Sequence, residues 1–172
     1  MLRSPRLDLV ELCPETLARI ADRDRAWVEA KLGAEVPEEW LDVVPAEVNH
    51  RLLREDPTAA PWLSRGIVLR DECCLVGEIG FHNRPDSLAV VEIGYEVLPG
   101  FQRRGIAREA VYALTDWAHA ANEARVVYAT IARSNRASLA LVRSLGFRYD
   151  ETYVDPVDGP LVFFESKLPL AR

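Results

Sequence analysis

The sequence predicts an α/β protein built on a mixed β-sheet of about six to seven strands, with helices on both faces. Its 172 residues fit one domain, which we place at residues 6–170. Hydrophobic residues make up 49% and charged residues 28% of the chain, as in soluble globular proteins. The apolar pattern alternates between strand and helix periods, and one strand–helix–strand unit is flanked by hairpins, which favours a mixed sheet.

The first predicted strand covers residues 6–12, because apolar and polar residues alternate along it. A helical stretch follows over 14–32, opened by Pro14 and ended by Gly33. Short helical pieces are expected over 36–61, since prolines interrupt that segment three times.

Three strands are predicted next, and the first two form a hairpin. They cover residues 62–70 and 73–81, and Asp71-Glu72 supplies the turn between them. The third strand covers 88–98, after a loop that contains Pro85.

The rest of the chain begins with a long amphipathic helix over 103–121 and a strand over 125–132. Another helix starts at Ser134-Asn135 and is closed by Gly146 as the residue after its C-cap. Two further strands are expected at 147–154 and 161–168, joined by a turn over 156–159.

Several classes of protein are disfavoured by composition. The net charge of −6 does not suit a nucleic-acid binder. No apolar run is long enough to cross a membrane, and we expect an unexported, cytoplasmic protein. The cysteines and histidines lack metal-ligand spacing, so no metal site is expected and the thiols are expected to be reduced; these residues are Cys13, Cys73, Cys74, His50, His82 and His119.

The most informative segment is 92–107, where a strand runs into a short loop and the loop opens a long helix. The first N–H groups of that helix have no acceptor in a preceding turn, and its dipole adds positive potential, which together make an anion site. Gly105 would let a phosphate approach the backbone, while Arg103 and Arg104 add positive charge. The alternative is an ordinary turn followed by a solvated helix end.

The run Gln102-Arg103-Arg104-Gly105-Ile106-Ala107 resembles the Q/R-x-x-G-x-G/A pyrophosphate loop of the GNAT superfamily of acetyl-CoA-dependent N-acetyltransferases. Upstream, Glu92-Ile93-Gly94-Tyr95 looks like the central strand of that family. Downstream, Asn135-x-x-Ser138 with Gly146-Phe147 is similar to its N-x-x-[SA]…G-F pattern. The resemblance runs from about Arg6 to Leu168 and is strongest to the branch of ribosomal-protein N-terminal acetyltransferases.

The resemblance implies a GNAT-like fold in which the strands at 88–98 and 125–132 run parallel and splay apart. It also implies acetyl-CoA as the cofactor, released as coenzyme A. The pantetheine arm would pair with backbone near Val97, and the pyrophosphate would bind Gln102 and the N–H groups from Arg103 through Gly105 and Ile106 to Ala107. Asn135 would contact the cofactor, although its position suits a helix N-cap equally well.

The resemblance makes Glu92 the candidate general base, with a structural carboxylate as the alternative. Two positions depart from the family pattern: Thr130 stands where some members have a glutamate, and Val142 where many have a tyrosine acid. Ser138 is then the candidate that assists the departing sulfur, unless it is only a first-turn helix residue. A backbone N–H near Val97 or Leu98 would stabilise the oxyanion.

The function implied is transfer of an acetyl group to a primary amine, of a small molecule or a peptide N-terminus, by direct attack in a ternary complex. The alternative is a catalytically weak acyl-CoA-binding sensor or assembly module; a longer acyl group is a third possibility. Residues 29–56 carry eight acids against three bases, which favours a cationic acceptor, unless they are only a solvated helical face. We expect a monomer or homodimer without nucleic-acid or membrane partners.

Overall fold

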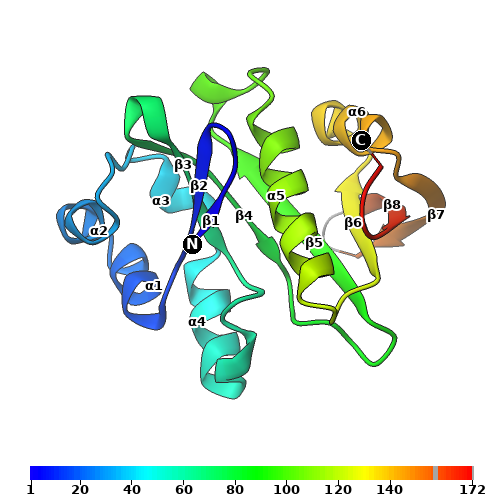
Figure 1. The fold of residues 1–172 in the computed structure, drawn as a ribbon, viewed down its shortest axis with the longest axis horizontal. Helices are drawn as coiled ribbons and strands as arrows, with labels where there is room; N and C mark the ends of the chain where they lie inside the picture. The colour runs from blue at the N-terminus through cyan, green and yellow to red at the C-terminus, as the bar shows by residue number, and fades with distance from the viewer. Residues whose placement is uncertain (157–158, 172) are drawn as a thin grey trace. The chain divides into compact units, whose positions relative to one another are not determined.

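A computed structural model describes residues 1–156 and 159–171, and these residues form eight strands in the order β1-β2-β3-β4-β5-β6-β8-β7 (Figure 1). The strands are β1 Leu2–Arg3, β2 Leu7–Glu11, β3 Arg65–Leu69, β4 Cys74–Phe81, β5 Val90–Val97, β6 Val126–Ala132, β7 Arg148–Asp155 and β8 Gly159–Lys167. The mixed sheet predicted from the sequence is confirmed, and the two-residue strand β1 is added to it. The turn predicted at 156–159 contains residues 157–158, which lie outside the described residues.

The described helices are α1 Pro14–Ala21, α2 Arg25–Leu32, α3 Trp40–Val43, α4 Ala46–Glu55, α5 Ile106–Ala120 and α6 Arg136–Ser144, with short 3₁₀ turns at Pro57–Ala59, Arg70–Glu72 and Pro99–Phe101. None of the described helices combines the length and the apolarity that a bilayer-spanning helix needs. The chain divides into two compact units, residues 1–84 with 94–113 and residues 85–93 with 114–172, and both β5 and α5 run through the two.

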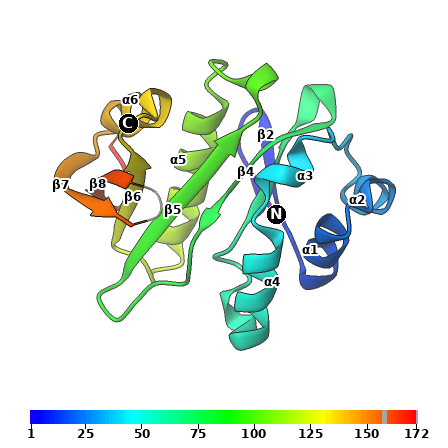
Figure 2. The same ribbon diagram turned by 180° about the vertical axis from the view of Figure 1, so that it is seen from behind.

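The first unit packs α1–α4 against an antiparallel array of strands (Figure 2). Its hydrophobic core includes Leu17, Trp40, Leu53 and Leu75, each at most 5% exposed. The Trp40 indole also donates to the carbonyl of Gly77 on β4 at 2.7 Å, which fixes α3 to the sheet. Burial of these large side chains is the main stabilising contribution in this unit.

The helical stretch predicted over 14–32 is divided in two, and that prediction is corrected here. Arg23 adopts a left-handed φ of +56°, which ends α1. The Asp24 carboxylate then accepts a hydrogen bond from the Trp27 N–H at 3.3 Å and caps α2. Gly33, at φ +67°, ends α2 as expected.

The second unit contains β6, β8 and β7, with α6 beside β6 (Figure 1). The parallel ladder between β5 and β6 joins Val90–Glu92 to Val126–Tyr128, whereas β5 continues to Val97 and β6 to Ala132. Strand β8 is antiparallel to both β6 and β7, and β7 is the last strand of the sheet.

Helix α6 ends in a Schellman motif, and Gly146 is the residue after its C-cap, as predicted from the sequence. Gly146 has φ +83° and its N–H donates to the Arg143 carbonyl at 3.1 Å. The Phe147 N–H donates to the Val142 carbonyl at 3.1 Å. The chain therefore turns directly from α6 into β7.

Candidate functional site

The loop predicted to bind phosphate has an unusual backbone. Arg103 and Gly105 both have positive φ, +61° and +76°. Because these conformations are not helical, α5 begins at Ile106, three residues later than the predicted start at Arg103. The first helical bond runs from the Glu109 N–H to the Gly105 carbonyl at 3.1 Å, so the N–H groups of the preceding turn point out of the helix end.

Gly105 suits close approach by an anion. Among the described residues, a Cβ added at this position would meet one heavy atom within 4 Å beyond its chain neighbours, an Arg6 guanidinium nitrogen at 3.5 Å. A side chain would therefore fill space in front of the helix end and would also be strained by the positive φ. The charge and shape of this end fit a phosphate group.

The backbone before the loop is held at two points. The Gln102 side-chain amide donates to the Val97 carbonyl at 2.9 Å. The Leu98 N–H donates to the Val76 carbonyl of β4 at 2.9 Å. Of the two backbone N–H groups predicted to stabilise the oxyanion, that of Leu98 already has an acceptor. The N–H of Val97 therefore stays proposed for this role.

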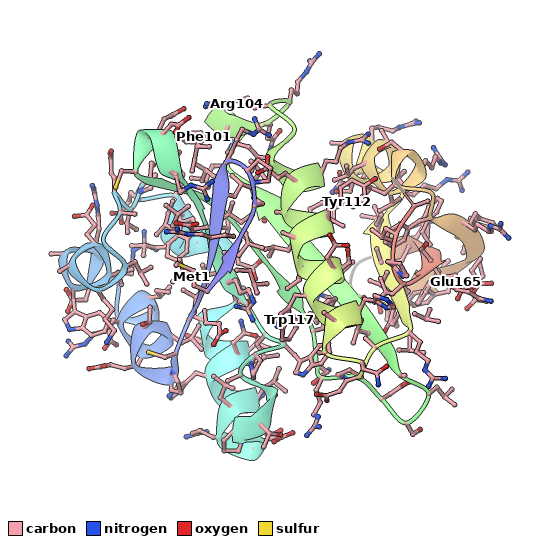
Figure 3. All side chains as sticks on the ribbon, viewed as in Figure 1. Met1, Phe101, Arg104, Tyr112, Trp117 and Glu165 are labelled. Atoms are coloured by element: carbon pink, nitrogen blue, oxygen red, sulfur yellow. The ribbon has the colours of Figure 1, made fainter. Side chains whose placement is uncertain are left out.

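The two arginines of the loop differ in their contacts. Arg104 forms an ion pair with Glu72, and its guanidinium lies 5.4 Å from the centre of the Phe101 ring (Figure 3). Because the Arg104 side chain contacts Glu72 and Phe101, its backbone N–H is the group that stays proposed for contact with the cofactor. Arg103 is exposed.

An N-terminal segment braces the loop, which sequence reasoning missed. The Glu109 carboxylate of α5 accepts hydrogen bonds from the Ser4 hydroxyl at 2.6 Å, and from the Arg6 N–H and Nε at 2.7 Å each. Arg6 also donates to the Arg104 carbonyl at 3.0 Å. Burial alone would raise the pKa of Glu109, but these hydrogen bonds outweigh it and hold that pKa below its usual value. No local pattern signals a contact between residues about a hundred positions apart.

In the second unit, Glu92 has a specific partner. The Tyr128 hydroxyl donates to the Glu92 carboxylate at 3.0 Å, across the parallel β5–β6 ladder. Burial, together with the negative charge of Glu92, raises the pKa of Tyr128 to about 12. Tyr128 therefore stays protonated near neutral pH and orients the carboxylate as a donor. Sequence reasoning did not single out Tyr128, although it occupies a half-buried position of an alternating strand.

The start of α6 shows the capping role that was the alternative for Asn135. Its side-chain oxygen accepts a hydrogen bond from the Ser138 N–H at 3.0 Å, which places Asn135 at the N-cap and Ser138 in the first turn. The amide nitrogen of Asn135 is not used in this cap, so capping is compatible with a second contact. Asn135 is exposed and Ser138 is half-buried.

The two departures from the family pattern lie in different environments. Val142 is 1% exposed and belongs to the packed face of α6. Thr130 is half-buried on β6 and is the register partner of Phe163 on β8. Neither side chain supplies a group that titrates near neutral pH.

A buried acid in the first unit was also missed. Glu78 on β4 is 7% exposed. Burial raises its pKa to about 7, and the charge of Glu96 adds to the rise, whereas a hydrogen bond from Ser64 and the nearby His82 oppose it. The His82 ring lies against Gly94, where a Cβ would come within 2.7 Å of Nε2. The signal in the sequence was a single acid inside the apolar strand predicted over 73–81.

Comparison with known proteins identifies a family. The family model of the acetyltransferase (GNAT) domain matches residues 3–148. Among curated proteins, the chain is similar to "Uncharacterized N-acetyltransferase YoaA" of Bacillus subtilis (strain 168), with 34% identity over 83 residues. That match covers 48% of this chain and 47% of the relative, so the chain spans about half the length of that protein.

Solved structures show the same fold at low identity. The ribosomal-protein-S5-alanine acetyltransferase from Vibrio fischeri superimposes with a TM-score of 0.67 and 16% identity, over 98% of this chain and 96% of that chain. The microcin C7 self-immunity acetyltransferase MccE, in complex with acetyl-CoA and AMP, gives a TM-score of 0.67 and 12% identity, over 96% and 94%. These likenesses establish the fold.

Proposed function

Since this chain belongs to the GNAT acetyltransferase family, we propose that it transfers an acetyl group from acetyl-CoA to a primary amine by direct attack in a ternary complex. The observation that carries the proposal is the entry of the loop into α5, where Arg103 and Gly105 have positive φ and the first helical N–H groups point outward. That arrangement supports the proposal because outward-pointing N–H groups at a helix start favour an anion such as the pyrophosphate of coenzyme A.

Each unit has its own residues that we propose for acetyl-CoA. The N–H groups of residues 103–107 would bind the pyrophosphate, and Gln102 would keep the loop in register through its bond to Val97. Asn135 would add its amide nitrogen, since its oxygen caps α6. Acetyl-CoA would supply the activated thioester.

Glu92 is the proposed general base. An amine must lose a proton before it can attack, and a carboxylate is a suitable acceptor directly or through water. The hydrogen bond from the Tyr128 hydroxyl orients the Glu92 carboxylate. Ser138 remains the proposed group near the departing sulfur; a thiolate is a tolerable leaving group, so strong acid assistance is not required.

The acceptor that we propose is a cationic amine. Of the eight acids in residues 29–56, at least four already pair with arginines of the same unit. Arg23 binds Glu38 at 2.6 Å and Asp42 at 2.5 Å, for example. These ion pairs reduce the negative potential of residues 29–56. The acids outside these pairs would attract the cationic acceptor.

The experiment that tests cofactor binding compares glycine variants by calorimetry with acetyl-CoA. Gly105→Glu is expected to abolish binding, because its carboxylate would oppose the pyrophosphate. Gly105→Ala carries the same backbone strain without the charge and should bind more weakly than wild type but measurably. Gly100→Ala is the control, since a Cβ added there would meet no heavy atom of the described residues within 4 Å beyond its chain neighbours. Unchanged affinity in a folded Gly105→Glu protein would remove the basis for the assignment.

A further inference from the structure

One face of the second unit carries three aromatic side chains in contact. The rings of Tyr128 on β6 and Phe163 on β8 are nearly parallel, with an interplanar angle of 14° and centroids 5.6 Å apart. The ring of Tyr153 on β7 lies 5.4 Å from that of Phe163 and is tilted by 51°. We refer to Tyr128, Phe163 and Tyr153 as the aromatic strip.

The aromatic strip is not a part of the core. Along β6, buried residues alternate with half-buried ones, and Tyr128 belongs to the half-buried set whereas Val127 and Ala129 are at most 2% exposed. Phe163 is half-buried as well, and Tyr153 is 38% exposed. The strip is therefore partly exposed to solvent, on the side of the strand opposite to the buried residues.

Negative charge lies at both ends of the strip. Glu92 accepts the Tyr128 hydroxyl at 3.0 Å, and the Tyr153 hydroxyl lies 3.5 Å from the Asp155 carboxylate. Glu165, labelled on β8 in Figure 3, is the register partner of Tyr128, and Arg148 on β7 is opposite Glu165. Acids outnumber bases by five to two in the sequence of residues 148–167; these are Asp150, Glu151, Asp155, Asp158, Glu165, Arg148 and Lys167.

We propose that Phe163 and Tyr153 of the aromatic strip, with Asp155 beside Tyr153, bind the positively charged alkylammonium group at the far end of a diamine acceptor. The proposal rests on the proposed function, in which Glu92, at the Tyr128 end of the strip, takes the proton of the reacting amine. Aromatic faces attract cations through their quadrupole, and nearby carboxylates add to that attraction. A neutral aromatic ligand would use the rings but would gain nothing from the acids, so charge complementarity favours the cation.

The first test compares putrescine with n-butylamine, two acceptors that differ in a second charge. The wild-type protein should acetylate putrescine with a higher kcat/KM. Phe163→Leu and Tyr153→Leu should each lower kcat/KM for putrescine by about twofold to thirtyfold, the range of cation–π energies. Both variants should leave kcat/KM for n-butylamine and the KM for acetyl-CoA unchanged.

Matched variants separate the ring from other effects. Tyr153→Phe keeps the ring and should keep most of the preference for putrescine. Tyr149→Leu removes a more exposed tyrosine from the same strand, one that contacts Phe164 instead of the strip, and should change nothing. Circular dichroism shows whether Phe163→Leu folds. If it does not, Tyr153→Leu still tests the proposal, because Tyr153 is the more exposed of the two residues.

The second test measures binding without turnover, by NMR titration with tetramethylammonium, which cannot be acetylated. Chemical-shift changes of the strip residues that are seen in the wild-type protein and absent from Tyr153→Leu support the cation site. This result would hold even if no amine is acetylated and the proposed function fails. Equal kcat/KM for the two amines would overturn the proposal, as would equal losses for both amines in the strip variants. Absence of strip shifts in the wild-type protein would also overturn it.

Discussion

Position 92 holds a carboxylate that accepts a hydrogen bond from a tyrosine, and this tyrosine stays protonated near neutral pH. Tyr128 has a pKa of about 12, because burial and the charge of Glu92 both disfavour its ionised form. The hydroxyl therefore fixes the carboxylate without competing for the proton of an amine. This arrangement suits a group that accepts a proton from a substrate.

We expect Glu92→Gln to lower kcat by about 10²–10⁴, the usual effect of losing a positioned acid or base. The KM for acetyl-CoA should hardly change, because the proposed cofactor contacts are made by other residues. The loss should shrink at high pH, where more of the amine is already neutral. Steady-state kinetics across pH check this, and near-native kcat at pH 7 would exclude Glu92 as the base.

Glu78 predicts a pH-dependent stability. Its pKa rises from an ordinary 4.5 to about 7, mainly through burial. Between these values the native state keeps a proton that the unfolded chain has released, so the free energy of unfolding falls as pH rises through this window and levels off above it. The full effect is about 3 kcal/mol.

The variant Glu78→Gln cannot titrate and should lose this pH dependence. We expect its free energy of unfolding, measured by urea titration at several pH values, to exceed that of the wild-type protein increasingly from about pH 5 to pH 8. A constant difference between the two proteins across that range would contradict the assignment.

At the scale of elements, patterns along the chain predicted most strands and helices but only some of their boundaries. The break after α1 depends on Arg23 at positive φ and on capping by Asp24, and neither residue type by itself forces a break. The late start of α5 has the same cause, since Arg103 adopts a left-handed conformation that arginine rarely favours. The glycines at 33 and 146 did mark helix ends, because their conformational freedom is a local property.

In the candidate site, too, local features could be predicted from the sequence, whereas contacts between distant residues could not. Gln102, Gly105 and Asn135 could be proposed for the cofactor from the resemblance of their motifs to the family pattern, and their local contacts and backbone are as described above. Tyr128 and Glu109 could not, because their roles depend on neighbours supplied by other elements. Contacts between distant residues are set by strand register and packing rather than by local pattern.

The brace between the N-terminal segment and α5 gives a prediction for that element. Glu109→Ala removes the acceptor of three hydrogen bonds from Ser4 and Arg6. We expect a loss of about 1–3 kcal/mol in the free energy of unfolding and a higher KM for acetyl-CoA, because the loop carbonyl at Arg104 loses a positioned donor. Chemical denaturation and kinetics measure the two effects.

A matched control is Glu47→Ala, which removes an exposed first-turn acid from α4 and so reproduces any loss of interaction with the helix dipole. That variant should leave the KM for acetyl-CoA unchanged. Equal effects of the two substitutions would show that the brace does not position the loop.

For the whole molecule, the net charge of −6 sets the expected response to salt. An acidic protein attracts a cationic acceptor from a distance, and added salt screens that attraction. We expect kcat/KM for a diamine to fall between about 50 and 500 mM salt, with a smaller change in the affinity for acetyl-CoA. A salt-independent kcat/KM would mean that the acidity does not steer the acceptor.

The central claim is that the chain moves an acetyl group onto an amine, and isotope-labelled acetyl-CoA tests it most directly. The protein is incubated with labelled acetyl-CoA and putrescine, and the products are identified by mass spectrometry. We predict label on the amine nitrogen in an amount equal to the coenzyme A released. Label that stays on bound acetyl-CoA would contradict transfer and favour an acyl-CoA-binding sensor, and label recovered only as acetate would also contradict it.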